Sequence, residues 1–456
     1  MSNRGRVFGF SELAGIDVVK WPRFLPANFE KPNTRPLMQT GPGHYDDAVF
    51  TNLASRIGSP AAVNHSSLVS PLDRRLFLRQ LSAGALGLIG VSACHNAALA
   101  ADESRLLVHS KAPMNAEPLL PELVKSWVTP VESFFIRSHG NTPQVNADSY
   151  RLTVEGLVDA PLSLSLTDLG RFEPHGVTAT LTCAGNRRSE HSRLKPVKGV
   201  QWREGAIGNA KWRGVRLSDL LKKAGLRESA KHVWFEGLDA VEDGGKTFAF
   251  GGSIPLEKAL LDRDAVPGAL LATAMNDQPL TADHGFPVRM VVPGYIGARS
   301  VKWLSKIVVS DRPSPNHFIA DVYKLVDEGT LLEVAETGPI YRMPLNSAIC
   351  TPTAGAALKP GRVEVTGYAL PPGVPGVSIR KVEVSADSGR SWTEAKLTST
   401  ASEFCWQLWS VEISVNSATK ELIVRAIDSR GDAQPEAVRW NAKGYLFNAW
   451  HHVPVN

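Results

Sequence analysis

The segment LTCAGNRRSEH, from Leu181 to His191, constrains the chain more than any other stretch of its sequence. It places Cys183 beside an alanine and a glycine, small residues that let the backbone approach a ligand closely. Arg187 and Arg188 follow, and nearby positive charge favours the thiolate form of a cysteine. A thiolate in an electropositive loop suits a soft transition metal or nucleophilic chemistry. The fold must therefore present Cys183 to a ligand.

The other cysteines do not compete for this role. Of the four cysteines, Cys94 lies in an apolar leader, and cleavage after Ala100 would leave an odd number. At least one thiol is then free, buried or metal-bound. Cys350 and Cys405 are either a disulfide pair or two packed thiols, and burial is the preferred interpretation. The sequence has no CxxC pair and no CxxCH, which argues against structural zinc and against c-type haem on this chain.

A twin-arginine signal peptide is predicted at residues 71–100. The segment RRLFL, residues 74–78, introduces an apolar run that ends in small residues. The run from 81 to 93 is about 13 residues long, whereas a membrane span needs about 20. Processing is expected either by cleavage after Ala100 or, because VSAC resembles a lipobox, by lipidation of Cys94.

Residues 1–70 are predicted to be an unstructured extension, because they carry Pro, Gly, Asn and Ser without sustained periodicity. A signal peptide normally begins a chain, so its position suggests that translation starts downstream of Met1. The twin-arginine route carries folded proteins that have usually received a complex cofactor. We therefore expect a periplasmic protein with a cofactor.

The length and charge of the chain narrow the class of protein. At 456 residues it is too long for one ordinary domain. With 43% hydrophobic and 21% charged residues, it has the composition of a soluble globular protein. The net charge of +5 is not gathered into Lys/Arg runs. This pattern argues against a nucleic-acid partner and suits an anionic cofactor or substrate.

Periodicity separates two halves. The C-terminal segments RVEVTGYAL, RKVEVSAD, CWQLWSVEIS and ELIVRAID alternate polar and apolar residues between turns, which predicts a β-sandwich. In the first half, GVRLSDLLKKAGL predicts a short helix with Ser218 near its start and Gly225 near its end. Its combination with strands such as HVWFEGL favours α+β over all-β.

The segment TCAGNRRSE is similar to the signature around the molybdenum-binding cysteine of the sulfite oxidase family. Further blocks resemble that family in the same order: PVKGVQW (196–202), FEGLD (235–239), GGSIPLEKAL (251–260), DHGFPVRMVVPGYIGARSVKWL (283–304) and GYLFNAWHHVPV (444–455). The resemblance runs roughly from Ser104 to the C-terminus. Within the family the chain looks most like the bacterial sulfite and sulfane dehydrogenases of the SoxC type.

The resemblance implies an α+β fold in two parts. Residues 101–312 would form a sulfite-oxidase-type molybdopterin-binding oxidoreductase domain, and residues 345–456 an immunoglobulin-like β-sandwich dimerisation domain. Residues 313–344 would be a linker with an active-site tyrosine. A homodimer, or a part in a heterotetramer, is expected.

The implied cofactor is a molybdenum–molybdopterin, with Cys183 as the metal ligand. Arg289 and Lys302 suit its phosphate, and Asp239 can accept from pterin N–H groups. A histidine in an isolated DHG would be assigned to the core, but the surrounding DHGFPVR favours a cofactor contact for His284. The full set of implied contacts is Phe135, Ile136, Arg137, Ser138, His139, Cys183, Asp239, His284, Arg289, Ser300, Val301 and Lys302.

Substrate binding is expected to depend on cations, because sulfite is an anion that must be attracted and oriented. Arg137 and Arg188 match the family's substrate-facing arginines, and Tyr323, in DVYK, matches its active-site tyrosine. Lys198 and Trp202 complete the implied pocket. Taken alone, Trp202 would be assigned to packing.

One position departs from the family pattern. Where the family usually ends with AWHR, this chain has AWHH, so His452 takes the place of a permanent cation. We expect either weaker substrate binding as the pH rises and this ring loses its proton, or a substrate other than free sulfite.

The implied reaction is oxygen-atom transfer to sulfite, or to carrier-bound sulfane sulfur, with electrons passed to a separate c-type cytochrome. Two alternatives stay open. A periplasmic sulfoxide reductase-like molybdoenzyme would share only the first domain. A non-catalytic dimeric component of a sulfur-oxidation complex would not need Cys183 with its arginines, although His452 keeps it open. No nucleic-acid partner and no transmembrane span are expected.

Overall fold

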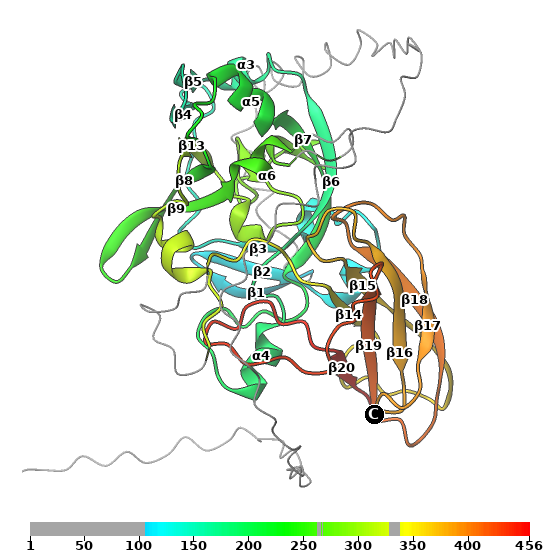
Figure 1. The fold of residues 1–456 in the computed structure, drawn as a ribbon. Coiled ribbons are helices and arrows are strands. Elements are labelled where there is room, and N and C mark those ends of the chain that lie inside the picture. The colour runs from blue at the N-terminus through cyan, green and yellow to red at the C-terminus, as the bar shows by residue number, and fades with distance from the viewer. Residues whose placement is uncertain (1–104, 262–265, 267, 328–337) are drawn as a thin grey trace, which may run out of the picture. The chain divides into compact units, whose positions relative to one another are not determined.

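The computed structural model describes residues 105–456, apart from 262–265, 267 and 328–337 (Figure 1). The predicted extension and signal peptide therefore lie outside the described residues, as does part of the linker predicted at 313–344. The described residues belong to one compact unit.

Three sheets build the first half of the described chain. A small antiparallel sheet has the order β1-β2-β3. A second sheet has the order β11-β10-β7-β6, with β12 also paired to β10. A third has the order β5-β4-β13-β8-β9, in which β4 and β13 run parallel. The bounds are β1 (Leu106–Lys111), β2 (Met114–Pro118), β3 (Ile136–Arg137), β4 (Leu152–Gly156), β5 (Leu162–Leu164), β6 (His175–Thr182), β7 (Ile207–Arg216), β8 (His232–Asp243), β9 (Lys246–Pro255), β10 (Leu270–Met275), β11 (Gln278–Pro279), β12 (Arg289–Val291) and β13 (Leu304–Ser310).

Short helices connect these strands. The predicted helix is confirmed as α5 (Leu217–Ala224), which buries Leu217, Leu220 and Leu221 at helical spacing. It ends at Gly225, whose φ of 69° is a conformation that glycine adopts without a steric penalty. The mixture of short helices and sheets confirms the α+β class. The other helices are α2 (Leu120–Leu123), η2 (Val131–Ser133), α3 (Leu166–Leu169), α4 (Arg188–Leu194), α6 (Leu256–Leu260), η3 (Gly297–Arg299) and η4 (Phe318–Val322).

The C-terminal part is the predicted β-sandwich. Its strands have the order β14-β15-β18-β17-β16-β19-β20. The four alternating segments of the sequence are confirmed as β15, β16, β18 and β19. Their buried faces form a separate core that includes Val382, Val384, Val424 and Ala426. The bounds are β14 (Asn346–Thr351), β15 (Gly361–Leu370), β16 (Ile379–Ser385), β17 (Thr393–Leu397), β18 (Gln407–Val415), β19 (Glu421–Asp428) and β20 (His451–Pro454).

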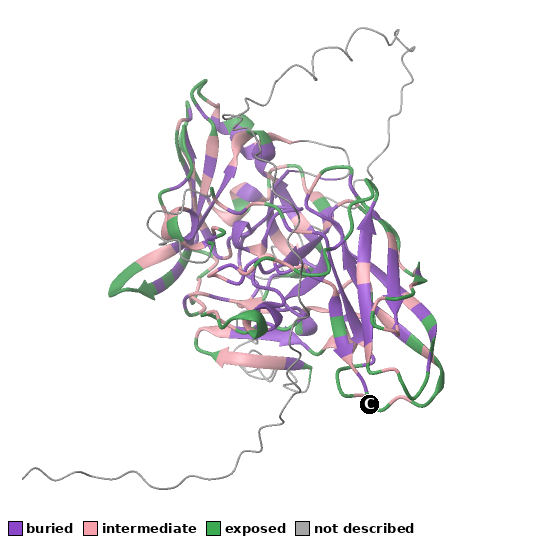
Figure 2. Cartoon of the chain, turned by 60° about the horizontal axis from the view of Figure 1, so that its bottom comes forward, coloured by how far each residue is buried: buried purple, intermediate pink, exposed green. Residues whose placement is uncertain are grey.

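A second core joins the two halves. It contains Leu181 and Cys183 from the end of β6, together with Cys350, Tyr368 and Trp406 from the sandwich. Buried segments run through both halves in Figure 2. Cys350 and Cys405 are free, buried thiols, which confirms the preferred interpretation of two packed cysteines. The strand that delivers Cys183 is therefore packed against the C-terminal part.

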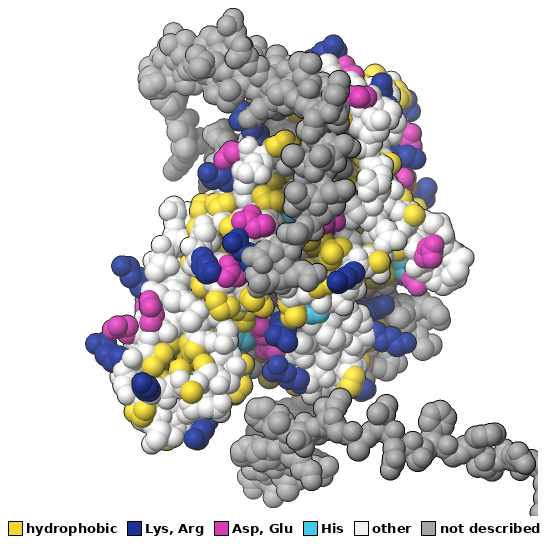
Figure 3. Space-filling view, turned by 180° about the vertical axis from the view of Figure 1, so that it is seen from behind, with side chains coloured by type: hydrophobic (Ala, Val, Ile, Leu, Met, Phe, Trp, Pro, Cys, Tyr) yellow, Lys and Arg dark blue, Asp and Glu magenta, His cyan; other side chains and the backbone are white. Residues whose placement is uncertain are grey.

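The surface carries mixed charge. On the face that Figure 3 shows, lysine and arginine side chains are interspersed with acidic ones. Among the described residues, no helix is long and apolar enough to cross a membrane.

Candidate functional site

A pocket lies where the chain leaves β6. It contains about 650 Å³ of empty space, a volume that includes open solvent at its mouth. The structure gathers in its wall most of the residues predicted to bind the cofactor or the substrate: Phe135, Arg137, Ser138, His139, Cys183, Asp239, His284, Arg289, Ser300, Lys302 and Tyr323.

Cys183 comes directly after β6 and lines this pocket. Its backbone N–H donates to the Ala206 carbonyl oxygen at 2.9 Å, and the Gly185 N–H donates to its sulfur at 3.4 Å. Cys183 is 8% exposed, whereas Cys350 and Cys405 are 0% and 1% exposed. Among the described thiols, Cys183 is therefore the one that a ligand in the pocket can reach.

Two buried cations of the pocket wall form no ion pair with any described residue. The guanidinium of Arg289, on β12, donates to the backbone carbonyl oxygens of His284 and Ser300, at 3.0 and 3.1 Å. The Lys302 ammonium donates to the Ser138 hydroxyl at 2.7 Å and to a backbone carbonyl oxygen at 2.8 Å. Within the described part of the chain, neither Arg289 nor Lys302 forms an ion pair.

Burial shifts the charges of these groups. It lowers the pKa of Arg289 to about 9 and, helped by the charge of Arg289, the pKa of Lys302 to about 7. Burial and the same two cations lower the pKa of His284 to about 4. These directions follow because a buried cation loses hydration and is repelled by its neighbours. A bound anion would relieve both effects.

Asp239 places a buried carboxyl group in the same pocket wall. Burial raises the pKa of its carboxyl group to about 6. Among the described residues, its Oδ1 is buried and has no hydrogen-bond partner. Buried polar atoms are normally satisfied, so this oxygen indicates a missing donor. An anionic ligand that also carries N–H groups would complete the pocket, and molybdopterin, with its phosphate and pterin, is such a ligand.

On the substrate side of the pocket, one arginine lies near the neutral rings of a tyrosine and a histidine. Arg137, on β3, donates to the Asn115 side-chain oxygen at 3.1 Å. The Tyr323 hydroxyl lies 3.1 Å from Nε2 of His139. Burial, reinforced by the charge of Arg137, lowers the pKa of His139 well below its usual value, and burial raises the pKa of Tyr323. Both rings are therefore neutral near pH 7 and share a hydrogen bond beside a permanent cation.

Arg188 packs beside the pocket and does not line it. It is the first residue of α4, and its Nε donates to the Lys443 carbonyl oxygen at 3.1 Å. Its guanidinium lies over the Tyr445 ring, 5.1 Å from the centroid. A Cβ atom on Gly185 would lie 2.7 Å from this guanidinium, and one on Gly199 would lie 2.9 Å from it. The two glycines therefore leave the space that the arginine fills.

Lys198 and Trp202 do not complete the pocket, contrary to prediction. Trp202 is 0% exposed and belongs to the core that joins the two halves. There its ring meets the His109 ring edge to face, with 4.9 Å between the ring centroids. A tryptophan buries a large apolar area, so packing accounts for its position. Lys198 is exposed and is not part of the pocket wall.

Ile136 and Val301 are likewise absent from the pocket wall. Val301 is 1% exposed, and its side chain fills the space beside Gly252, where an added Cβ would lie 2.9 Å away. Ile136 is half-buried on β3. On β3, alternation explains the position of Ile136, because its neighbour Arg137 points into the pocket.

The structure places His452 outside the pocket wall, at a distance from the predicted substrate site. Its side chain is 44% exposed on β20, and Nδ1 lies 3.0 Å from a Glu421 carboxylate oxygen. His451, one residue earlier, is buried and faces Glu204. Successive residues of a strand point to opposite faces, so His452 faces solvent, away from the pocket.

Sequence reasoning missed Asn115 and Lys443. Asn115 is 2% exposed on β2 and also accepts a hydrogen bond from the Ser138 N–H at 3.2 Å. No motif marks it. Lys443 immediately precedes the block GYLFNAWHHVPV, which could have directed attention to it. Burial lowers the pKa of this partly buried lysine, which contacts Arg188 through its carbonyl oxygen.

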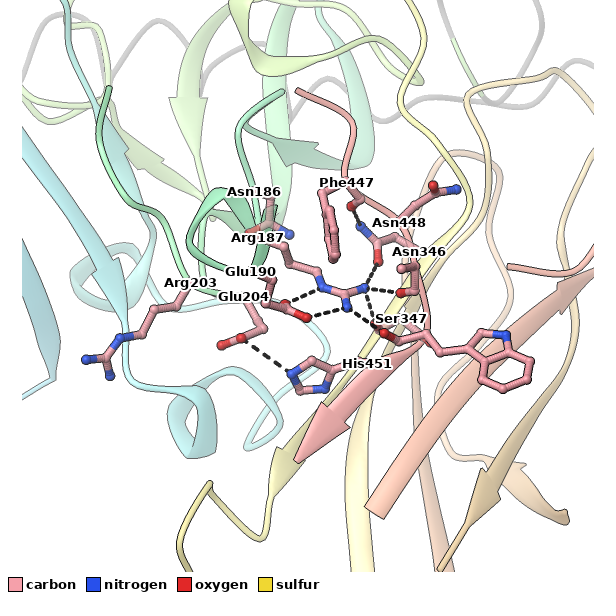
Figure 4. A network of polar contacts seen from close by, with 12 residues as sticks. Asn186, Arg187, Glu190, Arg203, Glu204, Asn346, Ser347, Phe447, Asn448 and His451 are labelled. Atoms are coloured by element: carbon pink, nitrogen blue, oxygen red, sulfur yellow. Dashed lines mark hydrogen bonds and ion pairs between the residues drawn. The ribbon is translucent and has the colours of Figure 1, made fainter. Parts of the chain in front are cut away.

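A second polar cluster lies on the other side of the Cys183 loop (Figure 4). Arg187 donates to both carboxylate oxygens of Glu190, at 2.7 and 2.8 Å. Burial alone would raise the pKa of Glu204, but the hydrogen bond and charge of His451 outweigh it and lower the pKa to about 2. Glu190, Glu204 and His451 lie close enough together to hold a metal ion. We assign no metal to them, because Arg187 already occupies the Glu190 carboxylate.

Comparisons with known proteins agree with this geometry. Residues 139–318 match the family model of the oxidoreductase molybdopterin binding domain, and residues 337–456 match that of the Mo-co oxidoreductase dimerisation domain. The mitochondrial sulfite oxidase of Rattus norvegicus is 44% identical over 77% of this chain, which spans 65% of that protein's length. The sulfite oxidase of Arabidopsis thaliana is 39% identical over 76% of this chain and 93% of its own.

A solved structure supports the same assignment. The crystal structure of the sulfane dehydrogenase SoxCD from Paracoccus pantotrophus matches with a TM-score of 0.64 and 27% identity. The match covers 77% of this chain and 88% of the other. The domain order, the relatives and the pocket around Cys183 lead to one conclusion: this chain belongs to the sulfite oxidase family of molybdopterin oxidoreductases.

Proposed function

We propose that this protein is a molybdenum-dependent oxidoreductase that oxidises free sulfite to sulfate. The observation that carries the proposal is the placement of the Cys183 thiol in a pocket whose buried cations, Arg289 and Lys302, form no ion pair among the described residues. Such a pocket suits an anionic cofactor that is also bound through sulfur.

The residues present fit the molybdenum cofactor. Cys183 would be the metal ligand, Arg289 and Lys302 would hold the phosphate, and Asp239 would accept from pterin N–H groups. The bound group supplies two-electron redox chemistry and an exchangeable oxygen, while the protein orients it and excludes water.

Arg137 would orient the anionic substrate, and Arg188, which packs beside the pocket, would add to the positive charge that attracts it. Their charges are permanent, and a guanidinium can donate two parallel hydrogen bonds to an oxyanion. Tyr323 and His139, both neutral near pH 7, would provide hydrogen-bonding groups without adding charge. Sulfate, the product, must also leave the pocket. Because the substrate side of the wall carries few cations, the product would not be held too tightly to be released.

Free sulfite is preferred to carrier-bound sulfane sulfur as the substrate. The relatives named sulfite oxidase reach 44% identity, whereas the sulfane dehydrogenase structure reaches 27%. The two alternatives differ in size, and only a carrier-bound sulfur requires room for a protein at the pocket mouth.

Three further parts of the proposal concern partners and location. Electrons would leave to a separate c-type cytochrome, because the sequence has no CxxCH of its own. Export to the periplasm by the twin-arginine route is proposed from the segment RRLFL and the short apolar run after it. A homodimer, or a part in a heterotetramer, is proposed from the match of residues 337–456 to a dimerisation domain.

The same match makes the sulfoxide reductase-like alternative less suitable, because that class was expected to share only the first domain. A non-catalytic component would have no need of a reachable thiol beside buried cations that form no ion pair with a described residue.

The direct test is sulfite-dependent reduction of cytochrome c by the purified protein, beside its Cys183→Ser variant. Removal of the proposed metal ligand should lower kcat by at least about a thousandfold. Cys350→Ser is the matched control, since it removes a buried thiol outside the pocket and should retain activity. Turnover of a protein persulfide but not of sulfite would support the sulfane alternative. Equal activity of the Cys183→Ser variant would contradict the proposal.

A further inference from the structure

The loop that carries Cys183 is held from outside by the C-terminal part of the chain. The Leu446 N–H donates to the Ala184 carbonyl oxygen at 2.8 Å. The Asn186 side chain donates to the Tyr368 hydroxyl at 3.2 Å. These contacts join the loop to the segment before β20 and to β15. The conformation of the loop is therefore not set by the first half alone.

Arg187 makes the largest number of these contacts (Figure 4). Its guanidinium is 0% exposed and donates to the Asn346 side-chain oxygen and the Ala449 carbonyl oxygen, both at 2.8 Å. It also donates to the Ser347 carbonyl oxygen at 3.3 Å and to the Trp450 carbonyl oxygen at 3.1 Å. Four acceptors on the C-terminal part therefore converge on one side chain of the Cys183 loop.

The backbone of Arg187 also requires support. Its φ of 65° and ψ of 23° lie in the left-handed region, which residues with a Cβ rarely adopt. Such a conformation persists only where the surroundings hold it. It marks the change of direction between the Cys183 loop and α4, which begins at Arg188. The side-chain contacts of Arg187 fix that change of direction.

Glu190 orients the guanidinium from the opposite side. The two parallel hydrogen bonds from Arg187 to its carboxylate, at 2.7 and 2.8 Å, form a bidentate pair. A lysine could not reproduce this pair together with the contacts to the sandwich, because it has a single point charge. The arrangement therefore depends on the arginine fork and not only on its charge.

We propose that Arg187 is a positioning residue, through which the C-terminal sandwich sets the place and direction of the Cys183 sulfur. The sandwich is then part of the active site as well as a dimerisation domain. Arg187 does not line the pocket, so it acts through the loop and not on substrate or cofactor. The inference rests on the proposed function, in that this sulfur is the proposed metal ligand.

The first test uses the full-length, cofactor-free protein and measures the rate at which iodoacetamide alkylates Cys183. Arg187→Lys keeps the positive charge but loses the fork, so the loop should open more often and alkylation should accelerate at least about fivefold. The Cys183→Ser variant gives the background from other thiols. Arg425→Lys is the matched control. It removes a guanidinium that pairs with Glu383 in the sandwich, at 2.8 Å, and should leave the rate unchanged.

The second test uses the cofactor-loaded protein. Because Arg187 does not face the substrate, Arg187→Lys should lower kcat and leave the KM for sulfite unchanged. If the wild type oxidises no sulfite, the proposed function fails, yet the difference in alkylation stands by itself. If Arg187→Lys matches the wild type in alkylation rate and kcat, the positioning role is overturned.

A milder variant covers the case in which Arg187→Lys does not fold. Asn346→Ala removes one acceptor of Arg187 on β14, together with the hydrogen bond that Asn346 donates to the Phe447 carbonyl oxygen, and leaves the ion pair with Glu190 intact. It should accelerate alkylation about twofold, because one of several contacts is lost. An unchanged rate in this folded variant would overturn the proposal.

Discussion

Buried cations lie on both sides of the Cys183 loop, but they differ in their hydrogen-bond partners. On the pocket side, Arg289 and Lys302 donate only to neutral oxygens, and burial lowers the pKa of both. On the sandwich side, Arg187 is equally buried but makes a bidentate pair with Glu190.

The contrast distinguishes a binding site from a structural network. A buried charge is tolerated when it is paired and hydrogen-bonded, and otherwise it destabilises the fold. The sandwich side is complete in itself, so its function is to hold the loop. The pocket side becomes complete only with an anion, so its function is to bind one.

The largest expected effect comes from breaking the paired side. Arg187→Met leaves the Glu190 carboxylate buried without its partner and should lower the free energy of unfolding by about 3 to 5 kcal/mol. Urea denaturation of the cofactor-free protein measures this change. The double variant Arg187→Met/Glu190→Leu should recover part of the loss, because no unpaired charge remains. A loss below about 1 kcal/mol in the single variant would refute the structural role.

The pH dependence of stability at Glu204 provides a second test of the sandwich side. Its folded pKa of about 2 lies below the unfolded value of about 4.3, so its stabilising contribution is present above that value and disappears as the pH falls toward 2. Glu204→Gln should therefore cost about 3 kcal/mol at pH 7 and progressively less in acid. Denaturation curves between pH 3 and 7 measure the difference. A gap between wild type and variant that is independent of pH would contradict this assignment.

Lys302 provides a test of the pocket side, because its effect on stability depends on pH through the titration of a cation and not of a carboxylate. Its folded pKa of about 7 lies below the unfolded value of about 10.4. Between these values the unfolded state binds more protons, so the cofactor-free wild type should gain stability as the pH rises. We expect Lys302→Met to remove about 2 kcal/mol of that gain between pH 7 and 9. Parallel pH profiles for the two proteins would show that Lys302 keeps an ordinary environment.

The smallest effect is expected at His452, outside both groups. His452→Ala removes only an exposed contact with Glu421 and should change the free energy of unfolding by less than about 0.5 kcal/mol. The pH dependence of the KM for sulfite should be the same in the variant and in the wild type. A KM that rises with pH in the wild type but not in the variant would restore the original assignment of His452 to the substrate site.

Local patterns in the sequence predicted much of the fold. Alternation identified the sandwich strands, and α5 followed from its apolar spacing and Gly225. The Cys183 segment and the motifs after it predicted most of the residues that line the pocket, because each motif is continuous in the chain.

The errors arose where side-chain direction or distant contacts decide. His451 and His452 differ by one position in β20, and only the strand register determines which of them is buried. Asn115, which the sequence did not indicate, supports Arg137 from another strand. The network around Arg187 joins the two halves of the chain, so no local segment of the sequence reveals it.

The most direct test of the account is the content of molybdenum and molybdopterin in protein purified from cells that make the cofactor. The account predicts both, in equal amounts and stoichiometric with the chain, in the wild type and in Arg425→Lys, which alters neither group of cations. It predicts marked loss of both in the double variant Arg289→Met/Lys302→Met. Folded wild-type protein without molybdenum, or full occupancy of the double variant, would contradict the claim that the unpaired cations form the cofactor site.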